Sequence, residues 1–141
     1  MAEQHANILM CLSSICHCLG EREKGLEYAQ AHFKQRILVE DSKPPAEQDG
    51  AFTAMAYTEL ALGLVMNGEY EEAITVAEQG RKLLEETPEF LEGDYWPHWA
   101  DYHHAWALIG LDRAAEACPI LEEMLEWRRK NVKNYATESI K

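Results

Sequence analysis

The sequence is poor in basic residues. Its 141 residues include 13 lysines and arginines against 25 aspartates and glutamates, which gives a formal net charge of -12. A surface of that sign repels the phosphates of nucleic acids and of anionic membranes. We therefore expect no nucleic-acid partner and no membrane partner. A protein or peptide with basic flanks would be attracted, although the simpler interpretation is that the charge only serves solubility.

The sequence also lacks the marks of a secreted or membrane-spanning protein. Its cysteines do not form the framework of a small disulfide-rich domain, because Cys11, Cys16 and Cys18 share one predicted helix and Cys118 lies far away. We expect the three in the helix to be buried and free. No apolar stretch is long enough to span a membrane, and no signal-peptide pattern opens the chain. We therefore expect a cytoplasmic protein.

The motifs of common enzymes are missing as well. The sequence contains no Gly-x-Gly-x-x-Gly, no Gly-x-Ser-x-Gly and no phosphate-binding loop. Acidic pairs such as Glu71–Glu72 fall on predicted outer helix faces, where carboxylates stay solvated and do not act as tuned acids or bases. We expect no enzyme activity and no cofactor.

A histidine-rich segment offers another candidate for chemistry. His98, His103 and His104 occur close to Asp94 and Asp101, and histidine and carboxylate side chains are zinc ligands. Their spacing matches none of the recognised zinc motifs, so we predict no metal site. The alternative is that His104 packs between helices and the others form local hydrogen bonds.

The sequence does contain long segments of helix-forming residues. Apolar residues recur at helical spacing, and the segments are separated by turn or proline positions such as Gly20, Pro44–Pro45, Asn67–Gly68 and Pro88. This pattern predicts an all-α fold with helices at about residues 3–19, 22–41, 46–66, 70–86, 97–109 and 113–132. Residues 133–141 are typical of the start of a further helix.

The tight turns make the six helices three antiparallel pairs, and the pairs repeat. When they are aligned on their internal turns, a small residue follows each turn by five positions: Gly25, Ala73 and Ala117. Small side chains are needed there because the two helices of a pair approach each other closely near the turn. We therefore predict a single domain, residues 1–141, with repeats at about 3–41, 46–87 and 97–132.

This pattern resembles the tetratricopeptide repeat (TPR), a helix-turn-helix of 34 residues. The matching positions of the second copy are Tyr57, Leu60, Ala61, Leu64, Gly68, Tyr70, Ala73 and Ala77, and those of the first are Leu9, Leu12, Gly20 and Ala29. The turns lie 48 and 44 residues apart, which is similar to the longer-spaced repeats of kinesin light chains and of large fungal multidomain proteins. The resemblance implies a right-handed solenoid of stacked helix pairs.

Some positions depart from the family pattern. Arg22 and Ala114 replace the usual aromatic residue, and Asp112 stands in place of the turn glycine. Pro119 lies inside the sixth predicted helix, where proline costs roughly 3 kcal/mol. We expect the helix to kink there, the alternative being a late start near Cys118.

The resemblance further implies that the first helix of each pair lines a concave groove. The groove would be rich in methionine and aromatic side chains, which suit a binding surface. Its predicted partner-binding residues are Met10, Met55, Thr58, Leu62, Met66, Trp99, Tyr102, His103 and Trp106. The alternative is that these side chains only pack against neighbouring helices.

The family's carboxylate clamp for chaperone tails needs lysine, arginine and asparagine. The corresponding positions here hold Met10, Ser14, Glu59, Trp99 and His103, so we expect no binding of acidic chaperone tails. The leading hypothesis is a non-catalytic scaffold that binds a peptide or helix with apolar anchors. The alternative is a structural or self-assembly segment of a larger repeat protein.

The ends of the chain show no polar capping helix, which terminal repeats normally carry. An uncapped end exposes an apolar face. We therefore expect either a longer array or self-association, and both predict that the isolated chain forms a homodimer or a larger homo-oligomer.

Overall fold

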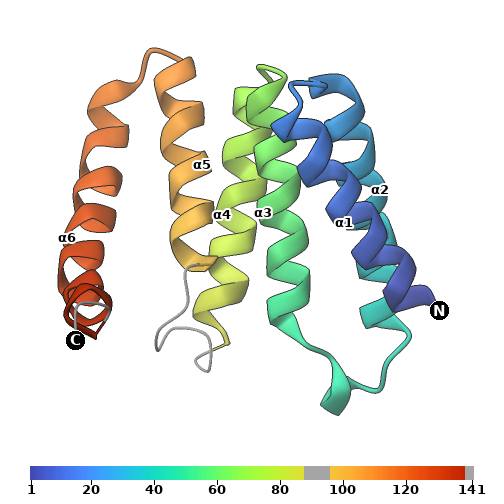
Figure 1. Ribbon diagram of the computed structural model, residues 1–141. Coiled ribbons are helices and arrows are strands. Elements are labelled where there is room, and N and C mark those ends of the chain that lie inside the picture. The colour runs from blue at the N-terminus through green and yellow to red at the C-terminus, as the bar shows by residue number, and fades with distance from the viewer. Residues whose placement is uncertain (88–95, 139–141) are drawn as a thin grey trace.

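The computed structural model describes residues 1–87 and 96–138 (Figure 1). The predicted connection at residues 89–96 lies outside them except for Trp96, and so do the last three residues of the predicted tail. The elements are α1 (Ala2–Cys18), α2 (Arg22–Asp41), the short 3-10 helix η1 (Pro45–Glu47), α3 (Gly50–Met66), α4 (Tyr70–Glu85), α5 (Trp96–Gly110) and α6 (Ala114–Glu138).

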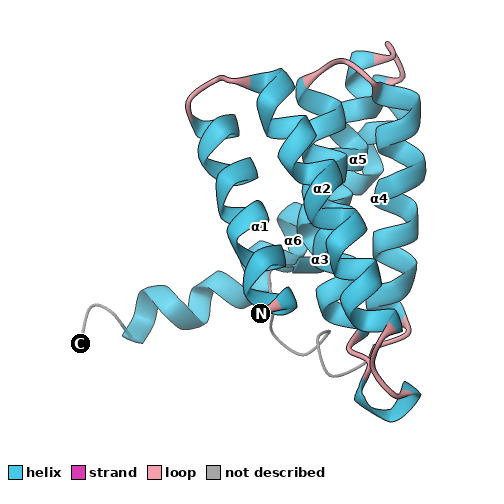
Figure 2. Cartoon of the chain, turned by 90° about the vertical axis from the view of Figure 1, so that its right-hand side faces the viewer, coloured by secondary structure: helices cyan, strands magenta, loops and turns pink. Residues whose placement is uncertain are grey.

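The helices form three antiparallel pairs that stack side by side, α1 with α2, α3 with α4, and α5 with α6 (Figures 1 and 2). The second helix of the first two pairs packs both on its own partner and on the first helix of the next pair. The described residues contain no strand. The all-α solenoid predicted from the sequence is therefore confirmed. In the described part of the chain, no helix is both long and apolar enough to cross a membrane.

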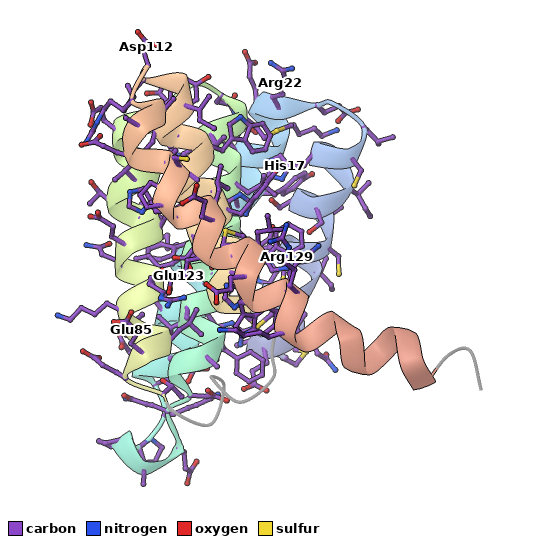
Figure 3. The ribbon with its side chains drawn as sticks, turned by 90° about the vertical axis from the view of Figure 1, so that its left-hand side faces the viewer. His17, Arg22, Glu85, Asp112, Glu123 and Arg129 are labelled. Carbon is purple, nitrogen blue, oxygen red and sulfur yellow. The ribbon has the colours of Figure 1, made fainter. Side chains whose placement is uncertain are left out.

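The helix bounds differ from the expected ones at two places. Helix α3 begins at Gly50 rather than near residue 46, because Pro45–Glu47 forms η1 and the Asp49 carboxylate then caps α3 by accepting a hydrogen bond from the Ala51 N–H at 2.9 Å. Helix α6 continues to Glu138 instead of ending near residue 132, since no proline or glycine interrupts it there. Residues 133–138 thus extend α6, and Figures 2 and 3 show its last part projecting from the bundle.

The three turns inside the pairs have the same backbone geometry. Gly20, Gly68 and Asp112 have positive φ angles of 76°, 78° and 61°, a conformation that favours glycine. In each turn the next N–H donates to the carbonyl five residues back: Glu21 to Cys16 at 2.9 Å, Glu69 to Leu64 at 2.9 Å and Arg113 to Leu108 at 2.8 Å. The alignment of the repeats, including Asp112 in the glycine position, is confirmed.

The small residues that follow the turns are buried as predicted. Ala73 and Ala117 are 0% and 1% exposed. At Gly25, an added Cβ would lie 2.5 Å from the His17 ring, so no larger residue fits without movement. The central core forms where α2, α3, α4 and α5 meet, around residues such as Leu64 and Ala77.

Helix α6 begins at Ala114 and runs through Pro119. The alternative of a late start near Cys118 is therefore wrong. The expected bend at Pro119 stays a prediction.

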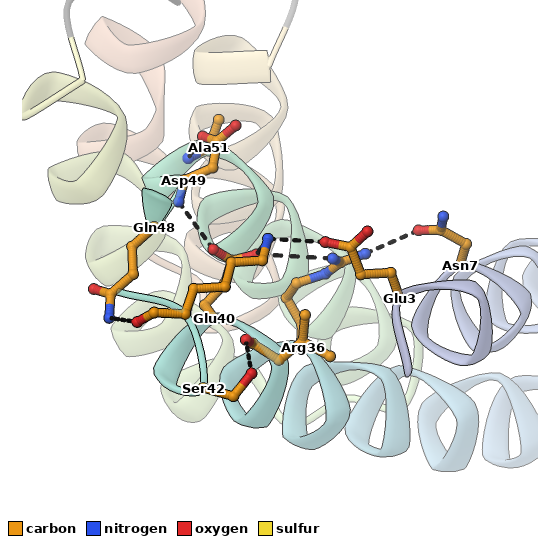
Figure 4. Close-up of polar contacts among 10 residues, drawn as sticks. Glu3, Asn7, Arg36, Glu40, Ser42, Gln48, Asp49 and Ala51 are labelled. Atoms are coloured by element: carbon orange, nitrogen blue, oxygen red, sulfur yellow. Dashed lines mark hydrogen bonds and ion pairs between the residues drawn. The ribbon is translucent and has the colours of Figure 1, made fainter. Parts of the chain in front are cut away.

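A buried polar network fastens the first pair to the linker that leads into α3 (Figure 4). Arg36 donates from Nη2 to the Asn7 side-chain oxygen at 2.8 Å, and its Nη1 lies 3.9 Å from Glu40 Oε1. Glu40 also accepts hydrogen bonds from Lys43 Nζ and from the Asp49 N–H, both at 2.9 Å. Arg36 and Glu40 are only 3% and 5% exposed. The pair therefore holds α1, α2 and the start of α3 together at one end of the bundle.

Candidate protein-interaction surface

Three large aromatic side chains stand in a row on α5. Trp99, Tyr102 and Trp106 are three and four residues apart, so they share one helix face. Their ring centroids are 6.1 Å apart from Trp99 to Tyr102 and 6.0 Å apart from Tyr102 to Trp106, both edge-on. They are 43%, 42% and 38% exposed. We call these three residues the aromatic ladder, and they are the part of the predicted binding surface that the structure brings together in the open.

His103 belongs to the same cluster but lies behind the ladder. Its ring stacks on Trp99 at 6.1 Å and meets Tyr102 edge-on at 5.7 Å, yet it is only 4% exposed. Burial, aided by the nearby His17, lowers the pKa of His103 to about 4, so the ring is neutral at pH 7. The prediction that His103 lines the surface is wrong, because it supports the ladder from the interior.

The ladder opens onto an apolar pocket between α5 and α6. The pocket has a volume of about 410 Å³, within the range of small-molecule and side-chain binding sites. The residues that line it are His98, Trp99 and Tyr102 from α5, and Leu121, Met124, Leu125 and Arg128 from α6. Leu125 is 49% exposed, so the apolar wall on the α6 side is accessible.

The sequence analysis missed the contribution of α6, since it assigned the binding surface to the first helices alone. A signal was present: Leu121, Met124 and Leu125 recur at helical spacing on a helix that no later pair follows among the described residues. His98, which also lines the pocket, contacts Trp127 of α6 with the two rings tilted and 4.0 Å between their centroids. Burial is the main reason that the pKa of His98 is lowered.

The predicted surface residues of α1 and α3 are placed differently. Thr58 is 3% exposed, and its hydroxyl donates to the Ala54 carbonyl at 3.0 Å. The prediction that Thr58 lines a groove is therefore wrong. Met10, Met55, Leu62 and Met66 are half-buried, and their part in partner binding stays a prediction.

One carboxylate lies where the chaperone-tail clamp would need a polar or cationic group. Glu59 of α3 is hydrogen-bonded to Ser14 of α1, and burial raises the pKa of its carboxyl while the hydrogen bond opposes that rise. An acidic tail would gain nothing from this group. The prediction that the chain does not bind such tails is untested, and the position of Glu59 favours it.

The histidine-rich segment does not assemble ligands in the described part of the chain. There, no three His, Cys, Asp or Glu side chains come close enough to hold a metal ion. Asp101 instead pairs with Arg81 at 2.9 Å, and His104 lies 3.8 Å from Glu78. Asp94 lies outside the described residues.

All four cysteines are free, but only one of them is buried. Cys16 is 5% exposed, whereas Cys11, Cys18 and Cys118 are exposed. The prediction of buried thiols is therefore wrong for Cys11 and Cys18. It overlooked that their face of α1 has no neighbouring helix in the described structure.

Comparison with known proteins gives one informative result. The sequence matches no protein-family model and no curated protein. The structure is similar to the crystal structure of a TPR-like protein from Chlorobium tepidum, with a TM-score of 0.71 and 22% sequence identity over 89% of this chain and 79% of that chain. At this identity the likeness concerns the fold and not the function, and the kinesin-light-chain-like spacing stays a prediction. The chain thus has a TPR-like fold.

Proposed function

We propose that the chain is a non-catalytic protein-interaction scaffold that holds a peptide or helix on the aromatic ladder and in the α5–α6 pocket. The observation that carries the proposal is the exposure of Trp99, Tyr102 and Trp106 side by side, next to an open apolar pocket. Exposed aromatic rings of this size lose water-contacting surface when a partner covers them. Tryptophan and tyrosine are also the residues most enriched at binding hot spots.

The geometry favours a partner with a bulky apolar anchor. A pocket of about 410 Å³ lined by Leu121, Met124 and Leu125 accommodates a large aliphatic or aromatic side chain. The ladder beside it offers a row of aromatic rings along α5 that neighbouring apolar residues of the same partner can contact. An amphipathic helix presents such anchors three or four residues apart.

The ladder has a rigid support, which favours binding by reducing the entropy that a partner must offset. Trp99 and Tyr102 contact each other and also the buried ring of His103. Half-buried Met10, Met55, Leu62 and Met66 would extend the contact onto α1 and α3, as adaptable methionine and leucine side chains do on peptide-binding surfaces. The net charge of -12 favours a partner with basic flanks. A cytoplasmic location is part of the same proposal.

The experiment is a peptide selection followed by titration. Random 15-residue peptides displayed on phage are selected on the immobilised chain, and the enriched peptides are synthesised and titrated while tryptophan fluorescence is recorded. We expect enriched peptides with large apolar residues spaced three or four apart, and affinities that weaken at high salt when basic residues flank them.

Matched variants locate the binding site. Tyr102→Ala should weaken binding of the synthesised peptides by about fivefold or more, the effect of removing a hot-spot residue. Leu38→Ala removes an exposed apolar side chain of α2, which is 57% exposed against 42% for Tyr102, and should leave the affinity unchanged. Equal affinities for the wild type and Tyr102→Ala would place the binding site elsewhere.

A further inference from the structure

Helix α1 exposes a second apolar surface, on a different helix from the aromatic ladder. Ile8, Cys11, Ile15 and Cys18 are three, four and three residues apart, so they form one stripe along the helix. Ile8 and Ile15 are 58% and 54% exposed, and both thiols are exposed. We call these four residues the α1 stripe.

The repeat register shows what this face does elsewhere in the chain. When the first two pairs are aligned on their turns, Gly20 and Gly68, the residues of α3 equivalent to Ile8 and Ile15 are Ala56 and Gly63. Ala56 is 0% exposed and Gly63 is buried. A Cβ added at Gly63 would lie 3.1 Å from Leu26 Cδ1 of α2. The face that α1 exposes is thus the face with which α3 packs on the preceding pair.

The third pair repeats this arrangement. The corresponding residues of α5 are Ala100 and Ala107, which are 1% and 0% exposed, and Ala107 belongs to the core shared with α4. Both internal junctions therefore use alanine or glycine, which lets two helices approach closely. Helix α1 has isoleucine at both positions, and its branched side chains prevent an equally close approach. A helix that covers the α1 stripe must lie farther away than α2 lies from α3.

The α1 stripe is also almost free of charge. Glu3 is the only aspartate, glutamate, lysine or arginine in α1, and it is paired with Lys43 at 2.8 Å. In a chain with a net charge of -12, such a face is where two copies can meet without placing like charges opposite each other. Isoleucines seven residues apart, with small side chains between them, also suit the packing of one helix on another at ordinary interhelical distance.

From these observations we propose that the occupant of the α1 stripe is a second copy of this chain, with the two α1 helices packed against each other about a two-fold axis. A two-fold interface uses the same patch on both partners, so one neutral, self-complementary stripe is sufficient. The inference does not rest on the proposed peptide site, because the aromatic ladder and the pocket lie on α5 and α6, and Met10, the α1 residue that would extend the peptide contact, is not part of the α1 stripe. A single helix pair buries less surface than a standard interface, so a dissociation constant in the micromolar range is expected, on the order of 10 µM.

The first test measures the oligomeric state of matched variants. The complete chain is studied by sedimentation velocity from about 1 to 200 µM, a range that brackets the expected dissociation constant. We expect the wild type to dimerise and Ile15→Glu to weaken the dimer at least tenfold, because two carboxylates would meet at the centre of the stripe. Leu125→Glu is the control, since Leu125 is similarly exposed at 49% but lies on α6. It should dimerise like the wild type while losing the selected peptides.

Other results would overturn the proposal. A wild type that stays monomeric at 200 µM would do so, and so would unchanged dimerisation of Ile15→Glu. Loss of association in both variants, with association regained when the two are mixed, would show a head-to-tail contact between α1 and α6 instead. The far-ultraviolet circular dichroism of each variant verifies that it is folded.

A second measurement needs no variant. Iodoacetamide alkylation of the wild type is followed by peptide mass spectrometry at 1 and 200 µM protein. Cys11 and Cys18 should react at least several-fold more slowly at the higher concentration because the dimer covers them. Cys118, exposed on α6, should react at the same rate at both concentrations. Equal rates at both concentrations for all three thiols would contradict the proposal.

Discussion

The first and the last helix pairs both expose apolar surface, but of two different kinds. The first pair exposes the α1 stripe of isoleucine and cysteine, and its interior is held by the buried network of Arg36 and Glu40. The last pair exposes the aromatic ladder, and a pocket of about 410 Å³ separates parts of its two helices. A flat aliphatic stripe fits a helix of its own kind, whereas a pocket with aromatic borders fits an anchor from a different partner.

The residue type at an equivalent repeat position therefore depends on whether a neighbouring helix covers that position. Ile8 lies on the exposed face of α1, and the equivalent residues on the covered faces of α3 and α5 are Ala56 and Ala100. The repeat register determines which face of a helix points towards the preceding pair. The size of the side chain on that face determines how closely another helix can pack on it.

Lowering the pH should weaken both end pairs, most strongly through the most deeply buried histidine of each, His32 and His103. Burial lowers the pKa of His32 in α2 and of His103 in α5 to about 4, from an ordinary value of 6.5. Each folded-state pKa lies below the unfolded-state value, so the unfolded chain binds more protons below pH 6.5. The stability is fully present above pH 6.5 and is lost as the pH falls towards 4. At pH 5 the loss is about 2 kcal/mol for each histidine.

Urea unfolding at pH 7, 6 and 5 measures this loss. The pKa values of Glu59 and Asp101 are raised by burial, so these carboxyls act in the opposite sense and reduce the net change. His32→Leu and His103→Phe isolate the histidines, because each variant should lose about 2 kcal/mol less than the wild type between pH 7 and 5. If only one variant shows the smaller loss, the two end pairs do not share this property.

Removing the buried carboxylate of the first pair should cost about 3 kcal/mol in the free energy of unfolding. Glu40→Gln removes the carboxylate paired with Arg36, whose charge is buried, since the residue is only 3% exposed. Urea unfolding at pH 7.5, above the range in which His32 and His103 change the stability, measures the difference.

The matched control is in α4, which packs on the last pair. Glu85 pairs with Arg81 at 3.1 Å, but its side chain is 59% exposed and Arg81 keeps Asp101 as a second partner. Glu85→Gln should therefore cost less than about 1 kcal/mol. Equal costs for the two variants would show that the network in Figure 4 is no stronger than a surface ion pair.

The repeat architecture could be predicted from the sequence because it depends on local signals. The turn glycines, the small residues after them and the apolar spacing each act within one helix pair, and the structure agrees with them at Gly68, Ala73 and Asp112. The exposure of Trp99 and Trp106 agrees with the groove positions that the resemblance to the TPR family implied for them.

Other features of the site depend on distances between helices, which spacing does not contain. Thr58 and His103 lie at the edge of a predicted exposed face, and contacts with neighbouring side chains decided that both are buried. Predicting the pocket would have required the distance between α5 and α6. Predicting that Cys11 is exposed would have required knowing that no helix of the described residues covers that face of α1.

The smallest expected effect concerns the turns, and it compares the middle pair with the last pair. Asp112 occupies the left-handed position of the α5–α6 turn, at the tip seen in Figure 3, with φ of 61°. The equivalent residue of the α3–α4 turn is Gly68, with φ of 78°. A side chain is strained in this conformation, although less so for aspartate than for most residues. Asp112→Gly should therefore stabilise the chain by about 0.5 kcal/mol, whereas Gly68→Ala should destabilise it by about 1 kcal/mol. Urea midpoints at equal slope measure both changes. A destabilised Asp112→Gly would mean that the aspartate side chain contributes more to the last turn than its backbone strain costs. The two turns would then be alike in geometry but stabilised by different means.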